Sequence, residues 1–221
     1  MRDILAIVLK EIWELKHSIK NFFLLFVAFL LLMIFVIITF DNSTSFIPAS
    51  LFPLLFVCAV AVGASGQIAL YTILGEKTSK TLEVLLSTGI APYTIIIGKL
   101  IPGTIIGYIL SVLAYIAMFI FTSFSKTFPL LNINWFLLII PFFLSYFAGG
   151  TSIAVTIWVP DEKIAPLIGT LIIFSFLGIL WYINSIFIST FIIFMFLIFL
   201  CLLTTWLAAI SLKRIPLITK I

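Results

Sequence analysis

The stretch Leu51–Leu74 reads LFPLLFVCAVAVGASGQIALYTIL and contains no Asp, Glu, Lys, Arg or His. A helix needs about 20 mainly apolar residues to cross the hydrocarbon core of a bilayer, so this stretch predicts a transmembrane helix. Five more stretches are long and apolar enough to predict transmembrane helices: Phe22–Phe40, Ile101–Phe124, Trp135–Ile157, Ile164–Tyr182 and Ile186–Ile210. We therefore expect an all-α, polytopic integral membrane protein, with six transmembrane helices in one domain over residues 1–221.

The composition of the chain supports this fold class. Of the 221 residues, 64% are apolar and 9% are charged, whereas a soluble domain is about 45–50% apolar and about a quarter charged. Such a chain cannot cover its surface with polar groups, which excludes a water-soluble enzyme and a disordered tail. The net charge of +4 is small and scattered, so we expect membrane lipid as its surroundings and no nucleic acid as a partner.

The positions of lysine and arginine predict the orientation in the membrane. If the N-terminus is inside, the inner segments hold Arg2, Lys10, Lys16, Lys20, Lys77, Lys80, Lys99, Lys163, Lys213, Arg214 and Lys220. The outer loops then hold only Lys126. Because cytoplasmic loops carry the excess of positive residues, we expect a multi-pass protein of the cell membrane with both termini in the cytoplasm.

Residues 1–21 precede the first predicted span and have the pattern of an amphipathic helix. One side carries Ile4, Leu5, Val8, Ile12, Leu15 and Ile19, and the other carries Asp3, Lys10, Glu14, His17 and Asn21. A helix of this kind can lie along the inner membrane surface with its lysines near anionic headgroups. The alternative is a cytoplasmic extension of the first span.

The longest inner segment, Gly75–Leu100, reads GEKTSKTLEVLLSTGIAPYTIIIGKL. Its first half predicts a short amphipathic helix, with Leu82, Leu85 and Leu86 on one face and Lys80, Glu83 and Ser87 on the other. Gly89 and Pro92 are expected to end it. Such a helix can dock into a groove of a partner protein, or it can lie on the membrane without one. The periodicity alone favours neither.

This segment resembles the signature of type-2 ATP-binding-cassette (ABC) transporter permeases. The matching residues are Glu76, Thr81, Leu82, Glu83, Leu85, Leu86, Thr88, Gly98 and Lys99. Two positions depart from the pattern, because Lys80 stands where glycine is usual and Gly89 where proline is usual. Val8–Leu15 is similar to the opening helix of that family, and Asp161, Glu162 and Lys163 are similar to its second inner loop.

The resemblance implies a permease subunit of an exporter, paired as a homodimer or heterodimer and bound to cytoplasmic ATP-binding cassette subunits. It implies that a coupling helix contacts the ATPase through Glu76, Lys80, Thr81, Leu82, Glu83, Leu85 and Leu86. ATP and Mg²⁺ would bind to the partner, with no cofactor on this chain. The sequence is consistent with this, because it contains no GxxxxGK[ST] phosphate loop. Gly98-Lys99 matches the end of that motif, but Tyr93 occupies the position of its first glycine and Leu100 the position of its Ser or Thr. We therefore expect no enzymatic activity of the chain itself.

Other chemistry finds little support in the sequence. The one histidine, His17, has no cluster of Cys or Asp around it, and Cys58 and Cys201 read as buried free thiols, so we expect no catalytic or metal site. Small and polar residues within the spans predict either a transport pathway or helix packing: Ser65, Gln67, Gly103, Gly107, Gly149 and Gly150. A scaffold subunit that transports nothing and a secondary carrier are the alternative functions. The lack of charge in the middle of any span argues against a proton-coupled carrier.

Overall fold

The computed structural model describes residues 4–14, 52–124, 135–159 and 190–218, with a few single positions between 164 and 175. Every described element is helical. Residues 4–14 form an N-terminal helical segment, followed by α2 (Phe52–Thr78), α3 (Thr81–Ser87), α4 (Pro92–Phe124), α5 (Trp135–Trp158) and α7 (Thr190–Ile218). The all-α prediction is confirmed for these residues. The predicted spans Phe22–Phe40 and, for the most part, Ile164–Tyr182 lie outside them.

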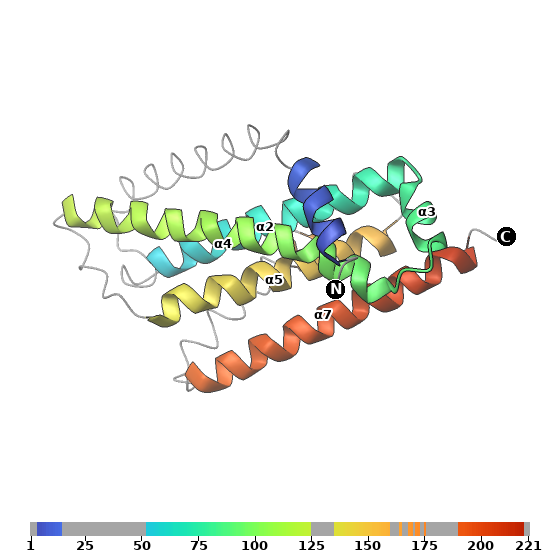
Figure 1. Ribbon diagram of the computed structural model, residues 1–221. Helices are drawn as coiled ribbons and strands as arrows, with labels where there is room; N and C mark the ends of the chain where they lie inside the picture. Colours follow the sequence, from blue (N-terminus) through green and yellow to red (C-terminus); the bar gives the residue numbers. More distant parts are fainter. Residues whose placement is uncertain are drawn as a thin grey trace.

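Four of these helices are long and apolar enough to cross a membrane: Phe56–Thr78, Pro92–Ile120, Ile139–Trp158 and Met195–Leu212. They lie side by side along the length of the molecule, and α3 lies at one end (Figure 1). In the most apolar 18-residue stretch of each helix, 67% of α2 and 61% of α5 are buried inside the structure, but only 39% of α4 and of α7. The chain is thus a multi-pass membrane protein, with α2 and α5 at the centre of the bundle.

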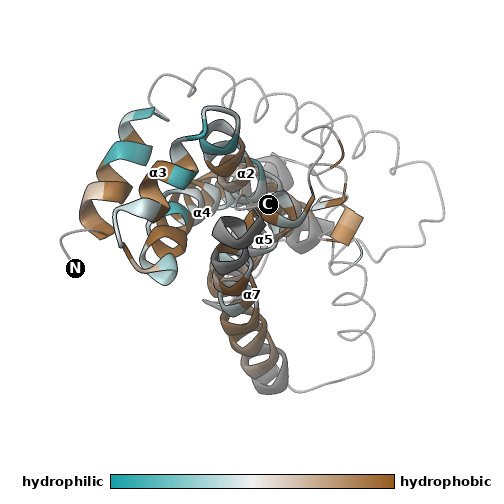
Figure 2. Cartoon of the chain, turned by 90° about the vertical axis from the view of Figure 1, so that its right-hand side faces the viewer, coloured by the Kyte–Doolittle hydropathy of each residue, from teal (hydrophilic) through white to brown (hydrophobic). Residues whose placement is uncertain are grey.

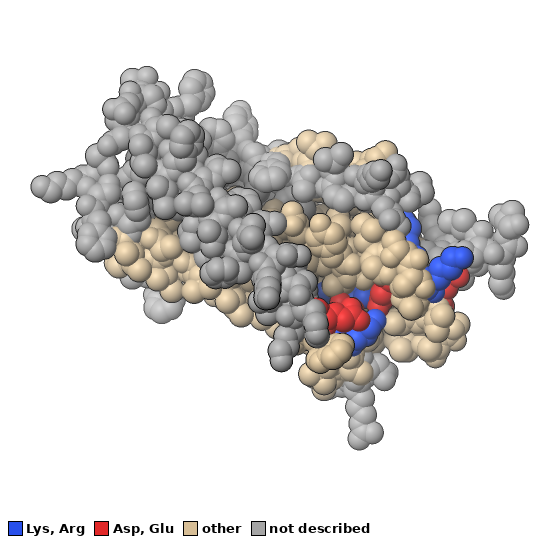
Figure 3. All heavy atoms as spheres, turned by 90° about the horizontal axis from the view of Figure 1, so that it is seen from above, with Lys and Arg blue, Asp and Glu red and all other residues tan. Residues whose placement is uncertain are grey.

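The outward faces of α4 and α7 carry large apolar side chains. On α4 they recur at helical spacing, and the exposed residues are Ile105, Ile109, Leu113, Ile116 and Ile120. On α7 the exposed residues include Met195, Phe199, Leu202 and Trp206. Charged side chains, in contrast, gather near one end of the face seen in Figure 3, and the remaining described surface there is uncharged. Such faces require lipid or another apolar surface around them.

Close approach of the helices depends on small residues. A Cβ atom at Gly107 of α4 would lie 2.9 Å from the carbonyl oxygen of Ala61 and 2.8 Å from Cβ of Ser65, both on α2. A Cβ atom at Gly150 of α5 would lie 2.7 Å from Oγ1 of Thr204 on α7. Glycine lets these helix backbones pack closely where any side chain would hold them apart.

Two helices extend beyond the predicted spans into the inner segment. α2 continues to Thr78 rather than ending at Leu74, and α4 begins at Pro92 rather than at Ile101. Proline suits the first turn of a helix because its missing N–H has no partner there in any case. The carbonyl of Ala91 accepts hydrogen bonds from the N–H groups of Thr94 and Ile95, at 2.9 and 3.3 Å. Glu76 and Lys99, predicted in a loop, therefore lie inside long helices.

Candidate functional site

The short helix α3 is set off from its neighbours by two turns with positive φ. Lys80 has φ 57° and Gly89 has φ 77°. The turn at Gly89 fits the prediction that the short helix ends near Gly89 and Pro92, whereas Lys80, which was predicted on the helix, lies in the turn before it. The left-handed conformation at Lys80 also explains why glycine would suit this position, since glycine adopts it without steric strain. Proline, whose φ is fixed near −65°, could not replace Gly89 in this turn.

Hydroxyl groups close the turn between α2 and α3. Oγ of Ser79 donates to the carbonyl oxygen of Gly75 at 2.7 Å, and Oγ1 of Thr78 donates to the same oxygen at 2.9 Å. The hydroxyls of Ser79 and Thr81 lie 2.8 Å apart. Because the last carbonyls of a helix have no partner within it, these side chains satisfy the end of α2 and define where α3 starts.

The two faces of α3 have opposite surroundings. Leu82 is 3% exposed and belongs to a buried cluster with Ile73, Ile95 and Leu212, while Leu85 and Leu86 pack against the edge of that cluster. The opposite face is exposed and carries Thr81, Glu83, Val84 and Ser87. The predicted division of faces is confirmed for the residues of the helix, and Lys80 is the exception because it precedes the helix. The leucines hold α3 to its own bundle, so only the polar face and Val84 are open to another protein.

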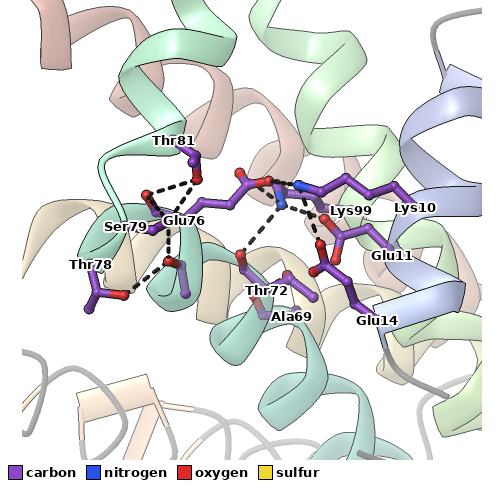
Figure 4. A network of polar contacts seen from close by, with 11 residues as sticks. Lys10, Glu11, Glu14, Ala69, Thr72, Glu76, Thr78, Ser79, Thr81 and Lys99 are labelled. Carbon is purple, nitrogen blue, oxygen red and sulfur yellow. Dashed lines mark hydrogen bonds and ion pairs between the residues drawn. The ribbon is translucent and has the colours of Figure 1, made fainter. Parts of the chain in front are cut away.

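A buried ion network lies beside this helix and joins three segments that are distant in the sequence (Figure 4). Nζ of Lys99 on α4 lies 2.6 Å from Oε1 of Glu11 and 3.0 Å from Oε2 of Glu76 on α2. Nζ of Lys10 donates to Oε1 of Glu76 at 2.7 Å. The side chains of Lys99, Glu11 and Glu76 are 0%, 1% and 7% exposed. The charges are therefore almost fully removed from water.

The charge balance of the network is tight. One fully buried ammonium group, on Lys99, faces two buried carboxylates, and Lys10 supplies the second positive charge from the half-exposed rim. Oε2 of Glu11 has no hydrogen-bond partner, and Oε2 of Glu76 is within ion-pair distance of Lys99 but outside hydrogen-bonding geometry. Leaving any one buried charge without its partner is strongly unfavourable.

The pKa directions follow from these surroundings. Burial raises the pKa of the Glu11 carboxyl above its ordinary value, and the Lys99 ammonium group opposes that shift without cancelling it. Burial lowers the pKa of Lys10, but its hydrogen bond to Glu76 and the nearby carboxylates outweigh burial, so the net shift is upward. Both groups thus hold their protons more tightly in the folded chain than they would in water.

The network is the part of this region that sequence reasoning missed. Glu76 was expected to face an ATPase, yet its side chain points inward to Lys10 and Lys99 (Figure 4). Glu11 was placed on neither face of the N-terminal helix, although it is buried together with Ile7, four residues before it. The available signal was two opposite charges, Glu76 and Lys99, next to long apolar runs, since such charges are tolerated only when paired.

The remaining predicted residues separate into three groups. Ser65 is buried in α2, and Gly103, Gly107, Gly149 and Gly150 all meet side chains or backbone of neighbouring helices of the same chain. Gln67 on α2 is half-buried. Asp161, Glu162 and Lys163 lie outside the described residues. Just before them, Nζ of Lys77 donates to the carbonyl oxygens of Thr156 and Val159, at 3.2 and 2.9 Å.

The N-terminal helical segment confirms the predicted helix where it is described, over residues 4–14, and its side buried against the bundle was not predicted. Ile7 and Glu11 face the bundle, whereas Leu5, Leu9, Ile12 and Trp13 are exposed. Viewed from the α3 end, hydrophilic colour is concentrated in this segment and around the α2–α3 turn, while α7 is hydrophobic along most of its length (Figure 2). The outward apolar side chains fit a helix lying at a membrane surface.

None of the protein-family models, curated proteins or solved structures with which the chain was compared matches it. Among the described residues, no group of three or more His, Cys, Asp or Glu side chains is placed to hold a metal ion. Cys58 and Cys201 are free and buried, as the sequence predicted.

Proposed function

We propose that this chain is the membrane-spanning permease subunit of an ATP-driven ABC transporter, an exporter of the type-2 class. The observation that carries the proposal is the form of α3. It is a short helix at the end of a bundle of apolar helices, fixed by Leu82 and open on its Glu83 and Val84 side. Four of the matching signature residues besides Thr81 lie on this helix, namely Leu82, Glu83, Leu85 and Leu86, whereas Glu76 lies in α2 and Gly98 and Lys99 lie in α4.

A coupling element must satisfy two conditions, and α3 satisfies both. It must present a face to the partner, and it must be attached firmly enough that a push on it moves the transmembrane helices. Val84 is 64% exposed, whereas Leu82 lies in a buried cluster with residues of α2, α4 and α7. Force applied at Val84 would therefore reach several spans at once.

The motor of such a transporter would be a separate protein. This chain has no GxxxxGK[ST] phosphate loop, so ATP and Mg²⁺ would bind to a cytoplasmic ATP-binding cassette subunit. A nucleotide-dependent partner can switch the permease only if it binds one arrangement of the spans more tightly than another. Two permease copies, or this chain and a related one, would form the pathway in the plasma membrane, with both termini in the cytoplasm.

The proposal is tested by co-expressing the chain with ATP-binding cassette subunits from the same organism. Purification of the chain should also recover the subunit and a vanadate-sensitive ATPase activity. The paired substitution Glu83→Arg and Val84→Trp should abolish this association with no loss of membrane insertion, because both side chains are exposed. Leu202→Trp, a bulky change at an exposed site on α7, is the matched control and should leave association intact. Unchanged association in the α3 variant would contradict the proposed role.

A further inference from the structure

We propose that Glu11, Glu76 and Lys99 form a latch through which the N-terminal helical segment and α3 hold each other in position. In this latch Glu76 is a positioning residue, because it touches both elements with different parts of itself. The inference concerns this chain alone and holds whether or not α3 binds an ATPase. It assigns to the ion network a role that the proposed function does not require.

The first observation is how the N-terminal helical segment is attached. Within residues 4–14, the buried side chains are Ile7 and Glu11. Ile7 fits against Gly98 of α4, and Glu11 pairs with Lys99 one residue further on. The buried part of this attachment thus consists of one apolar side chain and an ion network. Attachment by charges depends on every partner being present, since one unpaired buried charge is strongly unfavourable.

The second observation is the double role of Glu76. Its carboxylate holds the N-terminal segment through Lys10 and meets Lys99 of α4. Its backbone carbonyl oxygen accepts hydrogen bonds from the hydroxyls of Ser79 and Thr81, both at 3.4 Å, in the turn that starts α3. Figure 4 shows these two sets of contacts on opposite ends of the residue. Displacement of its side chain therefore disturbs the turn, and displacement of the turn disturbs the ion pairs.

The third observation is a shared hydrophobic core. Ile7 of the N-terminal segment and Leu82 of α3 belong to the same buried cluster, together with Ile95 and Leu100 of α4. Release of either side chain uncovers part of the cluster to which both belong. The packing and the ion network thus link the same two elements, and they do so independently.

The test uses two buried probes in the full-length chain in native membranes. Ile7→Cys reports release of the N-terminal segment, and Leu82→Cys reports release of α3, each by its rate of reaction with a water-soluble maleimide. Native Cys58 and Cys201 are buried in the bundle and serve as internal reporters of general unfolding. Leu9→Cys, which is exposed, corrects for reagent access. Each probe is measured alone and combined with Lys99→Met, and again with Glu76→Gln.

We expect Lys99→Met to raise the labelling rates of both probes by about tenfold or more, because it leaves the buried Glu11 carboxylate without its positive partner while Glu76 keeps only Lys10. Glu76→Gln should likewise raise both rates, while Cys58 and Cys201 stay unlabelled. The combined change Glu11→Gln, Glu76→Gln and Lys99→Met removes every buried charge and should restore protection. Glu14→Gln, an exposed acid that pairs only with Lys10 at the rim, is the matched control and should change neither rate.

Two outcomes would overturn the inference. If Ile7→Cys becomes reactive and Leu82→Cys does not, the network holds the N-terminal segment but does not link it to α3. If neither probe responds to Lys99→Met, the ion pairs do not hold the segment at all. Should Lys99→Met expose Cys58 as well, the milder Glu76→Gln variant decides between the same outcomes.

Discussion

A Cβ atom placed on Gly98 of α4 would lie 2.7 Å from Cγ2 of Ile7 in the N-terminal helical segment. The two segments therefore touch at a point where no larger residue fits, directly beside the Lys99–Glu11 ion pair. The contact explains the use of glycine in the first turns of α4. It also makes the position a sensitive place at which to separate the two segments.

We expect Gly98→Ala to lower the free energy of unfolding by about 1–3 kcal/mol, the usual effect of overfilling a packed site. The natural control is Gly75→Ala, because a Cβ atom there would meet nothing within 4 Å. That change should be neutral or stabilising by about 0.5–1 kcal/mol, since alanine favours the helix. Thermal unfolding of both variants in the same detergent checks the difference, and equal melting temperatures would contradict the close contact.

The left-handed conformation of Lys80 predicts that glycine is better at this position. Lys80→Gly should stabilise the turn by up to about 1 kcal/mol, because it relieves the steric strain of a side chain at positive φ. Gly89→Ala, which introduces the same strain in the second turn, should have the opposite effect of similar size. The measurement is the melting temperature of each variant. A fall for Lys80→Gly would show that its side chain holds the turn.

The raised pKa of Glu11 predicts that the N-terminal segment binds less tightly as pH rises. A carboxyl whose pKa is higher in the docked state contributes its full stabilisation below the ordinary value of 4.5. That stabilisation is lost as the pH rises from 4.5 through the raised pKa of the docked state. Lys10, whose pKa is also raised, keeps its contribution until the alkaline range. The groups that face Glu11 are Lys99 on α4, Glu76 on α2, and Lys10 and Glu14 on its own segment.

Labelling of Ile7→Cys relative to Leu9→Cys, measured from pH 5 to pH 8, checks this dependence, because the ratio cancels the pH dependence of the thiol reaction. The ratio should rise with pH in the parent chain and stay level when Glu11→Gln is added. A ratio that falls with pH would show that the ion pair with Lys99 outweighs burial.

The close contact of α2 with Gly107 of α4 predicts that a larger side chain at this position strongly destabilises the fold. Gly107→Val would force Cβ against the backbone of Ala61, which cannot move without shifting α2. We expect a loss of about 1–3 kcal/mol or failure to fold. Ile109→Val, on the exposed face of the same helix, is the control and should change stability little. Resistance to unfolding by SDS distinguishes the two variants.

The sequence was sufficient to predict the helices wherever apolar length decides the structure. The predicted span from Trp135 ends one residue before α5 does, and the faces of α3 follow from the spacing of Leu82, Leu85 and Leu86. It was insufficient at the ends of α2 and α4. There Glu76 and Lys99 look like loop residues, because a charge in a helix beside the membrane is tolerated only when it is paired. The sequence does not reveal the pairing, since Glu11, the partner of Lys99, is far away in the chain.

The same limit applies to the small residues of the spans. Gly107 and Gly150 carry the pattern of close helix contacts, but the pattern does not say which helix comes close. The structure places Gly107 against α2 and Gly150 against α7. Both contacts are internal to the chain, so these positions pack the bundle and do not need a second copy to explain them.

Lys77 has a wider consequence for the inner end of the molecule. Its ammonium group neutralises the negative pole of α5 by binding the carbonyl oxygens of Thr156 and Val159. Lys77 lies in the last turn of α2, just before the turn that begins α3. The end of α5 is therefore one lysine side chain away from that turn. A partner protein that covers Val84 would also lie over the C-terminal end of α5. One bound surface would then contact both the α2–α3 turn and the end of α5.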